Sequence, residues 1–263
     1  MTATATAPAP SVPRPRSASG AGVGGGGGAR GERPRSGRRT GCAAFFDVDG
    51  TLLSRSSPVT FWELWVRLAQ GLGREGEFAA LMEQAREGRE RAELNRAYFR
   101  LFRGVPRWHL EAVGRIWFEQ VRAAPDALLA APAAALAGHR RRGDAVVLVS
   151  GSGLPWLAPL ARSLGADLVL APRQLTDGSG ILTGGIDAPM IGAGKALAVR
   201  TTLSALRLDP DRCYAYGDHI SDLPMLAEVG RPVAVGGLAS APGAAGWPAL
   251  AAAPGPFRPV AGS

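Results

Sequence analysis

The sequence predicts an α/β protein in which a parallel sheet is covered by helices on both faces. Short apolar runs at residues 42–47, 145–150 and 213–217 each end in a polar turn, and the last two lead into helical patterns. None of these runs alternates between apolar and polar residues, which indicates strands buried on both sides. Strands of this kind that alternate with helices form Rossmann-like sheets. One more short strand is expected at 232–236, after a helix over 222–229.

A helical insertion is predicted between the first strand and the second. The chain there shows helical periodicity without a convincing strand, near 59–71, 76–103, 107–123 and 126–141. The first three segments are expected to form a cap over the sheet, and the fourth leads back into it. Helical aromatic side chains are usually buried, so the core of this insertion is expected to contain Trp62, Trp65, Trp108 and Trp117.

The predicted domain organisation is a catalytic core with one insertion and two tails. The core comprises 40–54 and 125–250, and the helical cap comprises 55–124. Within the core, the stretch 168–186 reads as a hairpin, because Asp-Gly-Ser-Gly at 177–180 separates two extended segments. The last residues, 251–263, are expected to form a flexible tail.

The first 39 residues predict a disordered tail that is rich in Arg, Gly and Pro. Seven arginines against the single Glu32 give a charge of 7 − 1 = +6 before residue 40, out of +8 for the whole chain. Almost nothing there can be buried, so ordering the segment would cost entropy without a return. An Arg/Gly-rich arm can bind nucleic acid, but no aromatic residue is interleaved with these arginines, so a solvated tail is favoured.

Cysteine usage and hydropathy favour a cytoplasmic protein. The two cysteines, Cys42 and Cys213, cannot make a disulfide framework or a cysteine zinc cage, and both are expected to stay thiols. No apolar run is long enough to span a bilayer, and no signal peptide or membrane anchor is recognised.

Asp47 and Asp49 are the first residues that predict chemistry. They stand two apart at the end of a predicted strand, where alternation places both side chains on the same side. An ionised Asp47 could attack a phosphorus atom, while Asp49 could donate a proton to the leaving oxygen and later activate water. Taken alone, Asp-x-Asp-Gly is equally typical of a turn or of a calcium loop, so the later residues decide between these interpretations.

Two further segments offer groups that can bind phosphate oxygens. Ser150 and the backbone amides from Gly151 onwards precede a predicted helix, although Ser152 also suits a simple helix cap. Lys195 lies in the first turn of another predicted helix, where the helix dipole disfavours a cation. A nearby anion would resolve that conflict, whereas the alternative is an ordinary surface lysine.

Asp218 and Asp222 form a second carboxylate pair, at the end of a predicted strand and in the opening turn of the following helix. Hard oxygen ligands of this kind suit Mg²⁺, which takes one or two protein carboxylates and keeps several waters. Asp222 could also act as a helix N-cap. Because ligands bind at the carboxyl ends of parallel strands, Asp47, Ser150 and Asp218 are expected to share one crevice.

These runs, in chain order, resemble the four motifs of haloacid dehalogenase-type phosphatases. They are Asp-Val-Asp-Gly-Thr at 47–51, Val-Leu-Val-Ser-Gly-Ser at 147–152, Gly-Ala-Gly-Lys at 192–195 and Gly-Asp-His-Ile-Ser-Asp-Leu-Pro-Met-Leu at 217–226. The resemblance covers roughly residues 41 to 240, and the helical insertion resembles the cap of the phosphoserine phosphatase-like branch, subfamily IB.

The resemblance implies a role for each residue of the site. It assigns the nucleophile to Asp47, the acid and base to Asp49, the phosphate ligands to Ser150 and Lys195, and Mg²⁺ to Asp47, the main-chain carbonyl of Asp49 and Asp218, supported by Asp222. The implied strand order places the first and fourth motif strands side by side, which makes Cys42 and Cys213 neighbours.

Three residues concern the substrate. Phosphoserine phosphatases usually carry a glutamate nine residues after the nucleophile to hold the substrate's ammonium, and this chain has Ser56 there. His219 stands where the family commonly has a small residue, and it is interpreted as an exposed loop histidine or as a contact to the leaving group. Arg55 is placed in the pocket from its position alone, as a ligand for a second negative group.

The resulting hypothesis is a hydrolase for a small phosphorylated metabolite other than phosphoserine. Its nearest alternative is a phosphotransferase, in which an alcohol other than water accepts the phosphoryl group from Asp47. A third is a non-catalytic nucleic-acid binder that uses the basic tail, and retention of the catalytic residue types argues against it. The sequence fixes neither the organic half of the substrate nor the oligomeric state.

Overall fold

The fold is described by a computed structural model that covers residues 41–69 and 73–257. The expected tail over 1–39 lies outside these residues, as do the last six residues of the expected C-terminal tail. Among the described helices, none is both long enough and apolar enough to cross a membrane.

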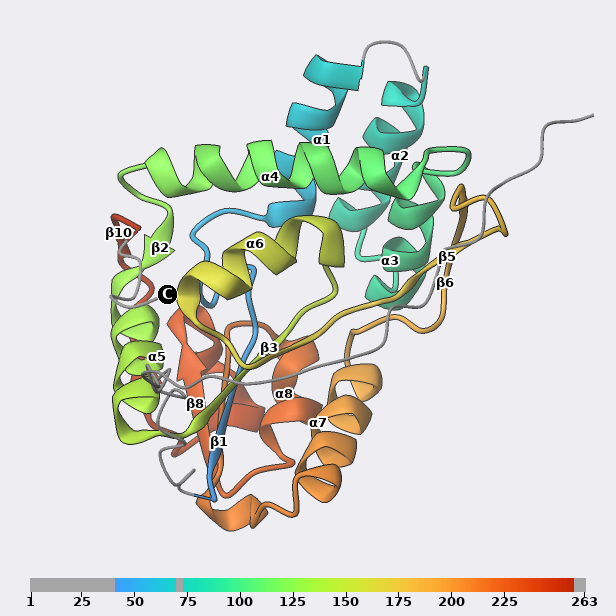
Figure 1. The fold of residues 1–263 in the computed structure, drawn as a ribbon. Helices are drawn as coiled ribbons and strands as arrows, with labels where there is room; N and C mark the ends of the chain where they lie inside the picture. The colour runs from blue at the N-terminus through green and yellow to red at the C-terminus, as the bar shows by residue number, and fades with distance from the viewer. Residues whose placement is uncertain (1–40, 70–72, 258–263) are drawn as a thin grey trace, which may run out of the picture. The chain divides into compact units, whose positions relative to one another are not determined.

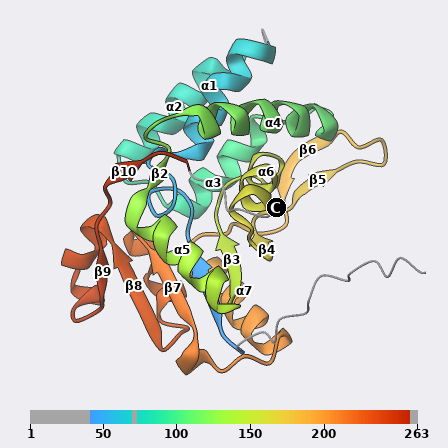
Figure 2. The same cartoon turned by 60° about the vertical axis from the view of Figure 1, so that its left-hand side comes forward.

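The centre of the fold is a six-stranded sheet with the strand order β4-β3-β1-β7-β8-β9 (Figures 1 and 2). All five pairings between neighbouring strands are parallel. The predicted parallel sheet is therefore confirmed. The strands are β1 Ala43–Phe46, β3 Ala145–Val149, β4 Leu168–Leu170, β7 Tyr214–Gly217, β8 Arg231–Val235 and β9 Ala249–Leu250.

Helices cover both faces of this sheet, as Figure 1 shows for α5 and α7. Side chains of β1 alternate between two apolar clusters: Ala44 and Phe46 lie in one, Ala43 and Phe45 in the other. The first cluster includes residues of α5 and α6, and the second includes residues of α7 and α8. These helices are α5 Ala130–Arg142, α6 Leu154–Leu164, α7 Ala193–Ala205 and α8 Leu223–Leu226.

Four helices follow β1 before the short strand β2 (Leu128–Leu129) (Figure 1). The expected helix over 76–103 is two helices, because Gly88 adopts a left-handed φ of 80° and the Glu90 side chain caps the second helix. Trp62, Trp65 and Trp117 are buried as expected, but Trp108 is 67% exposed, so its prediction was wrong. The helices are α1 Ser57–Ala69, α2 Glu75–Arg86, α3 Arg91–Arg100 and α4 Arg107–Ala123.

The expected hairpin over 168–186 is shorter than predicted. Its strands are β5 Gln174–Thr176 and β6 Leu182–Ile186, which pair antiparallel. The first residues of the stretch instead form β4, which pairs parallel with β3 as an edge of the main sheet. Short 3-10 turns connect other elements: Pro210–Arg212, Ile220–Asp222, Gly236–Ser240 and Pro242–Ala244.

The start of the expected C-terminal tail, 251–263, is ordered against the fold. β10 (Pro254–Gly255) pairs antiparallel with β2 (Leu128–Leu129). The buried ring of Phe257 packs edge-on against Phe118 of α4, with the ring centroids 5.8 Å apart. The prediction of a flexible tail was wrong for these residues, because an apolar side chain near the end of the chain finds a buried site.

The two cysteines lie side by side at the start of β1 and β7. The Ala43 amide donates a hydrogen bond to Cys213 Sγ at 3.3 Å, and Cys42 Sγ donates to the Arg212 carbonyl at 3.0 Å. Both are buried free thiols, and burial raises the pKa of Cys42 to about 12. The expected neighbourhood is confirmed, and the high pKa makes this thiol a poor nucleophile.

Candidate active site

Three neighbouring strands deliver the candidate residues to one end of the sheet. Asp47 follows β1, Ser150 follows β3 and Asp218 follows β7, and both β3 and β7 pair with β1 in parallel register. The Asp47 amide also continues the ladder by donating to the Tyr216 carbonyl at 3.0 Å. The polar end of each strand therefore lies at the same edge of the sheet.

Asp47 and Lys195 form a buried ion pair at the centre of this edge. Lys195 Nζ donates to Asp47 Oδ1 at 2.5 Å and to Asp222 Oδ1 at 2.7 Å. Burial opposes the charge on Lys195, but the two carboxylates outweigh it and raise the pKa of the ammonium. The disfavoured place of a lysine in the first turn of α7 is thus explained by the two anions it holds.

Asp49 is held in place by two serines that sequence reasoning did not single out for this role. The Ser57 amide donates to Asp49 Oδ1 at 2.5 Å, and the Ser152 hydroxyl donates to Oδ2 at 2.7 Å. The two serine hydroxyls also lie 2.7 Å apart. Burial raises the pKa of Asp49, while these hydrogen bonds oppose the rise. A carboxyl that is fixed in orientation and readily protonated suits general acid and base catalysis.

Asp47, Asp218 and Asp222 form a cluster that can bind a metal ion. One carboxylate oxygen from each lies within 4.8 Å of the others. Burial, together with the neighbouring carboxylates, raises the pKa of Asp47 well above its ordinary value although Lys195 opposes this, so an added cation would stabilise its charged form. Hard oxygen donors of this kind fit Mg²⁺.

Gly50 and Thr51 position the Asp218 carboxylate. Gly50 has a left-handed φ of 87°, and a Cβ added there would lie 2.3 Å from Asp218 Oδ2. The Thr51 hydroxyl donates to Asp218 Oδ1 at 2.8 Å. The turn after Asp49 therefore forms a cradle that a larger residue would fill, and its shape depends on glycine at this position.

Ser150 is fully buried and does not line the cavity beside Asp47. Its amide donates to the Leu170 carbonyl at 2.9 Å, and its hydroxyl accepts from the Ser152 amide at 3.1 Å. Gly151, in contrast, lines the cavity. Binding of phosphate by the Ser150 hydroxyl therefore stays a prediction, and Gly151 is the exposed part of this loop.

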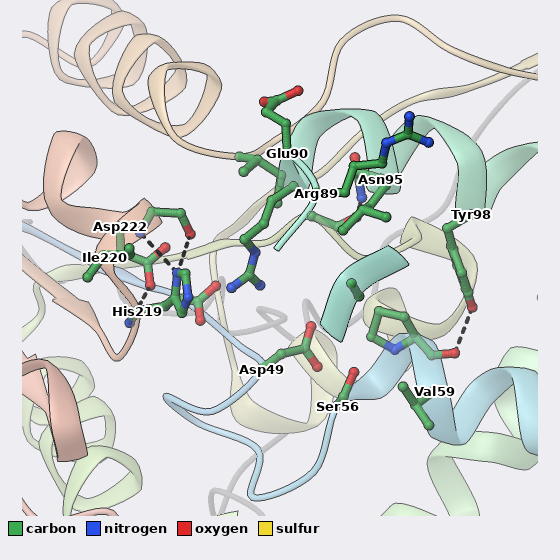
Figure 3. Close-up of a pocket in the computed structure, with 18 of the residues that line it drawn as sticks. Asp49, Ser56, Val59, Arg89, Glu90, Asn95, Tyr98, His219, Ile220 and Asp222 are labelled. Atoms are coloured by element: carbon green, nitrogen blue, oxygen red, sulfur yellow. Dashed lines mark hydrogen bonds between the residues drawn. The ribbon is translucent and has the colours of Figure 1, made fainter. Parts of the chain in front are cut away.

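The cavity has a volume of about 800 Å³ and lies between the sheet edge and the helical insertion. Figure 3 shows His219, Ile220 and Asp222 on one side and Val59, Asn95 and Tyr98 on the other. The Asn95 amide nitrogen donates to the Gly151 carbonyl at 2.7 Å, which joins α3 directly to the loop after β3. No sequence motif points to Asn95, since it is a polar residue within an ordinary amphipathic helix.

His219 lines the cavity and is only partly exposed. Its Nδ1 accepts a hydrogen bond from the Ser221 amide at 3.0 Å, and its own amide donates to Asp222 Oδ2 at 3.2 Å. Burial and then the charge of Arg91 lower the pKa of His219. The interpretation as an exposed loop histidine was therefore wrong, because the side chain caps the 3-10 turn that carries Asp222.

Arg55 does not lie in the cavity that contains Asp47. It is exposed and lines a separate cavity of about 190 Å³ together with Glu63 and Arg67. Its neighbour Ser56 lines the candidate active site instead. The placement of Arg55 in the pocket was wrong, because position along the chain did not define the direction in which the loop before α1 turns its side chains.

Comparison with known proteins gives consistent similarities. The haloacid dehalogenase-like hydrolase family matches residues 44–227. The chain is 36% identical to an inhibition of morphological differentiation protein of Streptomyces azureus, over 79% of this chain and 77% of that protein. It is 34% identical to a probable phosphatase of Mycobacterium tuberculosis (81% and 76%) and 31% identical to a phosphoserine phosphatase of Albidiferax ferrireducens (72% and 76%).

The fold is also found in a solved structure. A substrate-bound phosphoserine phosphatase complex superposes with a TM-score of 0.55, covering 73% of this chain and 85% of the other. The two sequences are 19% identical, so this likeness describes the fold alone.

Proposed function

This chain belongs to the haloacid dehalogenase-like hydrolases, and we propose that it is a Mg²⁺-dependent phosphatase that forms a phospho-aspartate on Asp47. The relatives support a phosphatase as the class of enzyme. The observation that carries the proposal for this site is the contact of Lys195 with both Asp47 and Asp222, beside Asp49 and Asp218 in one cavity. These groups supply a carboxylate nucleophile, a second carboxyl for acid and base catalysis, and a cation beside both.

In the first half-reaction, an oxygen of ionised Asp47 bonds to phosphorus while the bond from phosphorus to the substrate's alcohol oxygen breaks. Protonated Asp49 gives its proton to the alcohol oxygen, so the product leaves as a neutral alcohol. Lys195 holds Asp47 charged before attack and can donate to the phosphoryl oxygens during transfer. The amides after β3, beginning with Gly151, offer neutral donors to the same oxygens.

In the second half-reaction, ionised Asp49 removes a proton from water as the water oxygen bonds to phosphorus. The bond between phosphorus and Asp47 breaks, inorganic phosphate leaves, and Asp49 again holds the proton for the next turnover. Asp47, Asp218, Asp222 and the main-chain carbonyl of Asp49 would hold Mg²⁺, which supplies positive charge against the phosphate and the nucleophile. The two serines on Asp49 keep its carboxyl oriented through both steps.

A panel of phosphorylated metabolites assayed with Mg²⁺ tests this proposal, with Asp47→Asn as the blank. We expect release of inorganic phosphate by the unmodified chain and none above background by the variant. Added alcohols distinguish hydrolysis from phosphotransfer, because a transferase would give new phosphate esters in place of inorganic phosphate. Turnover that survives in Asp47→Asn would overturn the proposed nucleophile.

The proposed substrate is a small phosphomonoester other than phosphoserine, and the proposed location is the cytoplasm. Ser56, which lines the cavity, offers no charge to a substrate's ammonium. The buried free thiols Cys42 and Cys213 support a reducing compartment.

A further inference from the structure

The cavity beside Asp47 has two walls of different chemistry. The first, which we name the core wall, carries the ionic groups at the strand ends. The second, the cap wall, comes from α1, α2, α3 and the loop between α2 and α3. Apolar side chains dominate the cap wall: Pro58, Val59, Leu81, Met82, Ala85 and Leu94. An apolar part of a ligand would therefore be stabilised on this wall and not on the core wall.

Two isoleucines extend the apolar lining beyond the cap wall. Ile220 is 63% exposed although it stands two residues before the buried Asp222, and Ile191 lines the cavity next to Gly151. Figure 3 shows Ile220 across the cavity from Val59. An exposed isoleucine beside the ionic groups of the core wall is stabilised when an apolar group covers it.

The charges on the cap wall disfavour a positively charged ligand. Arg89 and Arg91 line the cavity. Among the described acidic residues of α2, α3 and the loop between them, Glu90 is the one that lines it. Both Glu90 oxygens accept hydrogen bonds from backbone amides at the start of α3, at 3.2 and 3.1 Å. Figure 3 shows this carboxylate turned away from Asp49. An ammonium group on the substrate would thus meet two guanidinium groups and no free carboxylate on this wall.

The cavity is also large enough to hold an extended organic group. At about 800 Å³ it lies in the upper part of the range of roughly 300–1,000 Å³ in which proteins bind drug-sized molecules. A small polar amino-acid phosphate would leave much of the apolar wall in contact with water.

We propose, building on the phosphatase function proposed above, that the substrate is a phosphomonoester with an extended apolar organic group and no ammonium group. The phosphate lies at Asp47, and the apolar group lies along the cap wall against Met82 and Leu94. Hydrolysis then follows the two half-reactions already given and releases an apolar alcohol and inorganic phosphate. The enzyme then prefers substrates according to how much of their apolar group the cap wall can cover.

The test is a series of unbranched alkyl phosphates with O-phosphoserine and p-nitrophenyl phosphate alongside. We expect kcat/KM to rise from ethyl to butyl to hexyl phosphate, by up to about fourfold for each methylene that becomes fully buried. O-phosphoserine should fall below ethyl phosphate. A series without dependence on chain length, or a preference for O-phosphoserine, overturns the inference while the phosphatase function stands. Failure to hydrolyse every compound, p-nitrophenyl phosphate included, overturns both.

Variants of the cap wall test whether this wall causes the dependence of kcat/KM on chain length. Met82→Gln keeps the size of the side chain, and Ala85→Gln changes an exposed position where folding is not at risk. In each we expect the ratio of kcat/KM for hexyl over ethyl phosphate to fall at least threefold. The matched control is Glu83→Gln, an exposed neighbour on the same helix whose partner is Arg86. A ratio that falls equally in the control, or that stays unchanged in both cap-wall variants, contradicts the proposed binding surface.

Discussion

The two walls of the active-site cavity differ in how their polar groups are satisfied. On the core wall, Asp47, Asp49 and Asp222 each accept hydrogen bonds from named partners at 2.5 to 3.2 Å. On the cap wall the groups that face the cavity are mostly apolar, and Arg89 and Arg91 are exposed. The core wall is therefore organised before a substrate arrives, whereas the cap wall offers surface that a substrate must cover.

The largest effect is expected when Lys195 is removed from the core wall. Lys195→Met leaves Asp47 and Asp222 buried without their ammonium, so kcat should fall about 10²–10³-fold for every substrate. The free energy of unfolding should drop by roughly 3–5 kcal/mol, as measured by urea denaturation. Leu197→Met, at an exposed position of the same helix, serves as the control. A loss confined to long-chain substrates would erase the distinction between the walls.

A smaller effect is expected from filling the cradle around Asp218. Gly50→Ala would place a Cβ 2.3 Å from the Asp218 carboxylate, so the Mg²⁺ concentration for half-maximal activity should rise about 10–100-fold. Gly41→Ala is a matched control, because Gly41 also has a positive φ of 69° but nothing lies within 4 Å of an added Cβ. Gly41→Ala should lose about 1–2 kcal/mol of stability without a change in Mg²⁺ dependence. Equal behaviour of the two variants would attribute the effect to backbone strain alone.

The hydrogen bond that joins α3 of the cap wall to the loop after β3 should have a modest effect. Asn95→Ala removes the hydrogen bond from α3 to the Gly151 carbonyl, which is worth about 0.5–1.5 kcal/mol. We expect kcat/KM to fall by roughly 2–12-fold, with the same factor for short and long substrates. Arg96→Ala, an exposed change at the next residue, should leave kcat/KM as it is. An unchanged rate in Asn95→Ala would show that the walls stay aligned without this contact.

The smallest effect concerns a buried histidine that lies outside the cavity. His139 contacts Asp144 and Tyr216, each at 2.8 Å, and Arg142 also lies beside it. Burial lowers its pKa below the ordinary value of 6.5. The folded chain therefore keeps His139 neutral while the unfolded chain takes up a proton below pH 6.5, so stability is present above this pH and is lost as the pH falls.

Thermal or urea unfolding between pH 7 and pH 6 measures this loss. We expect less than about 1 kcal/mol from His139 over that interval, and His139→Gln should flatten the dependence. A steeper dependence in the variant would instead mean that folding raises the pKa of His139. Activity per folded molecule should not follow this change, because neither wall contains His139.

The carboxylates at the strand ends of the core wall could be predicted from the sequence, because β1 and β7 are each followed directly by an aspartate. A buried run followed by a polar turn locates Asp47 and Asp218 at the same sheet edge without any knowledge of packing. The partners of Asp49 could not be found from the sequence for a physical reason: Ser57 begins α1 and Ser152 follows β3, 95 residues further along the chain, and nothing local brings them together. From the sequence alone, Ser152 is typical only of a helix cap.

The cap wall could not be predicted because helical periodicity identifies an apolar face but not the surface it will cover. Met82 and Leu94 carry the same pattern as residues that pack within the insertion, and only the fold turns them toward Asp47. The same limit explains Arg55, since a loop leaves the direction of a side chain undefined. Trp108 is the opposite example, because this aromatic residue of an amphipathic helix lies on the face that is exposed to solvent.

The proposed mechanism requires that Asp47 itself carries the phosphoryl group. Its most direct test is mass spectrometry of acid-quenched Asp49→Asn after mixing with p-nitrophenyl phosphate, whose leaving group needs no proton from Asp49. We predict a phosphoryl adduct on the peptide that contains Asp47. The adduct accumulates because the second step, which needs Asp49 as a base, is slow. The double variant Asp47→Asn/Asp49→Asn should give no adduct. An adduct on another residue, or one that persists in the double variant, would show that Asp47 is not the nucleophile.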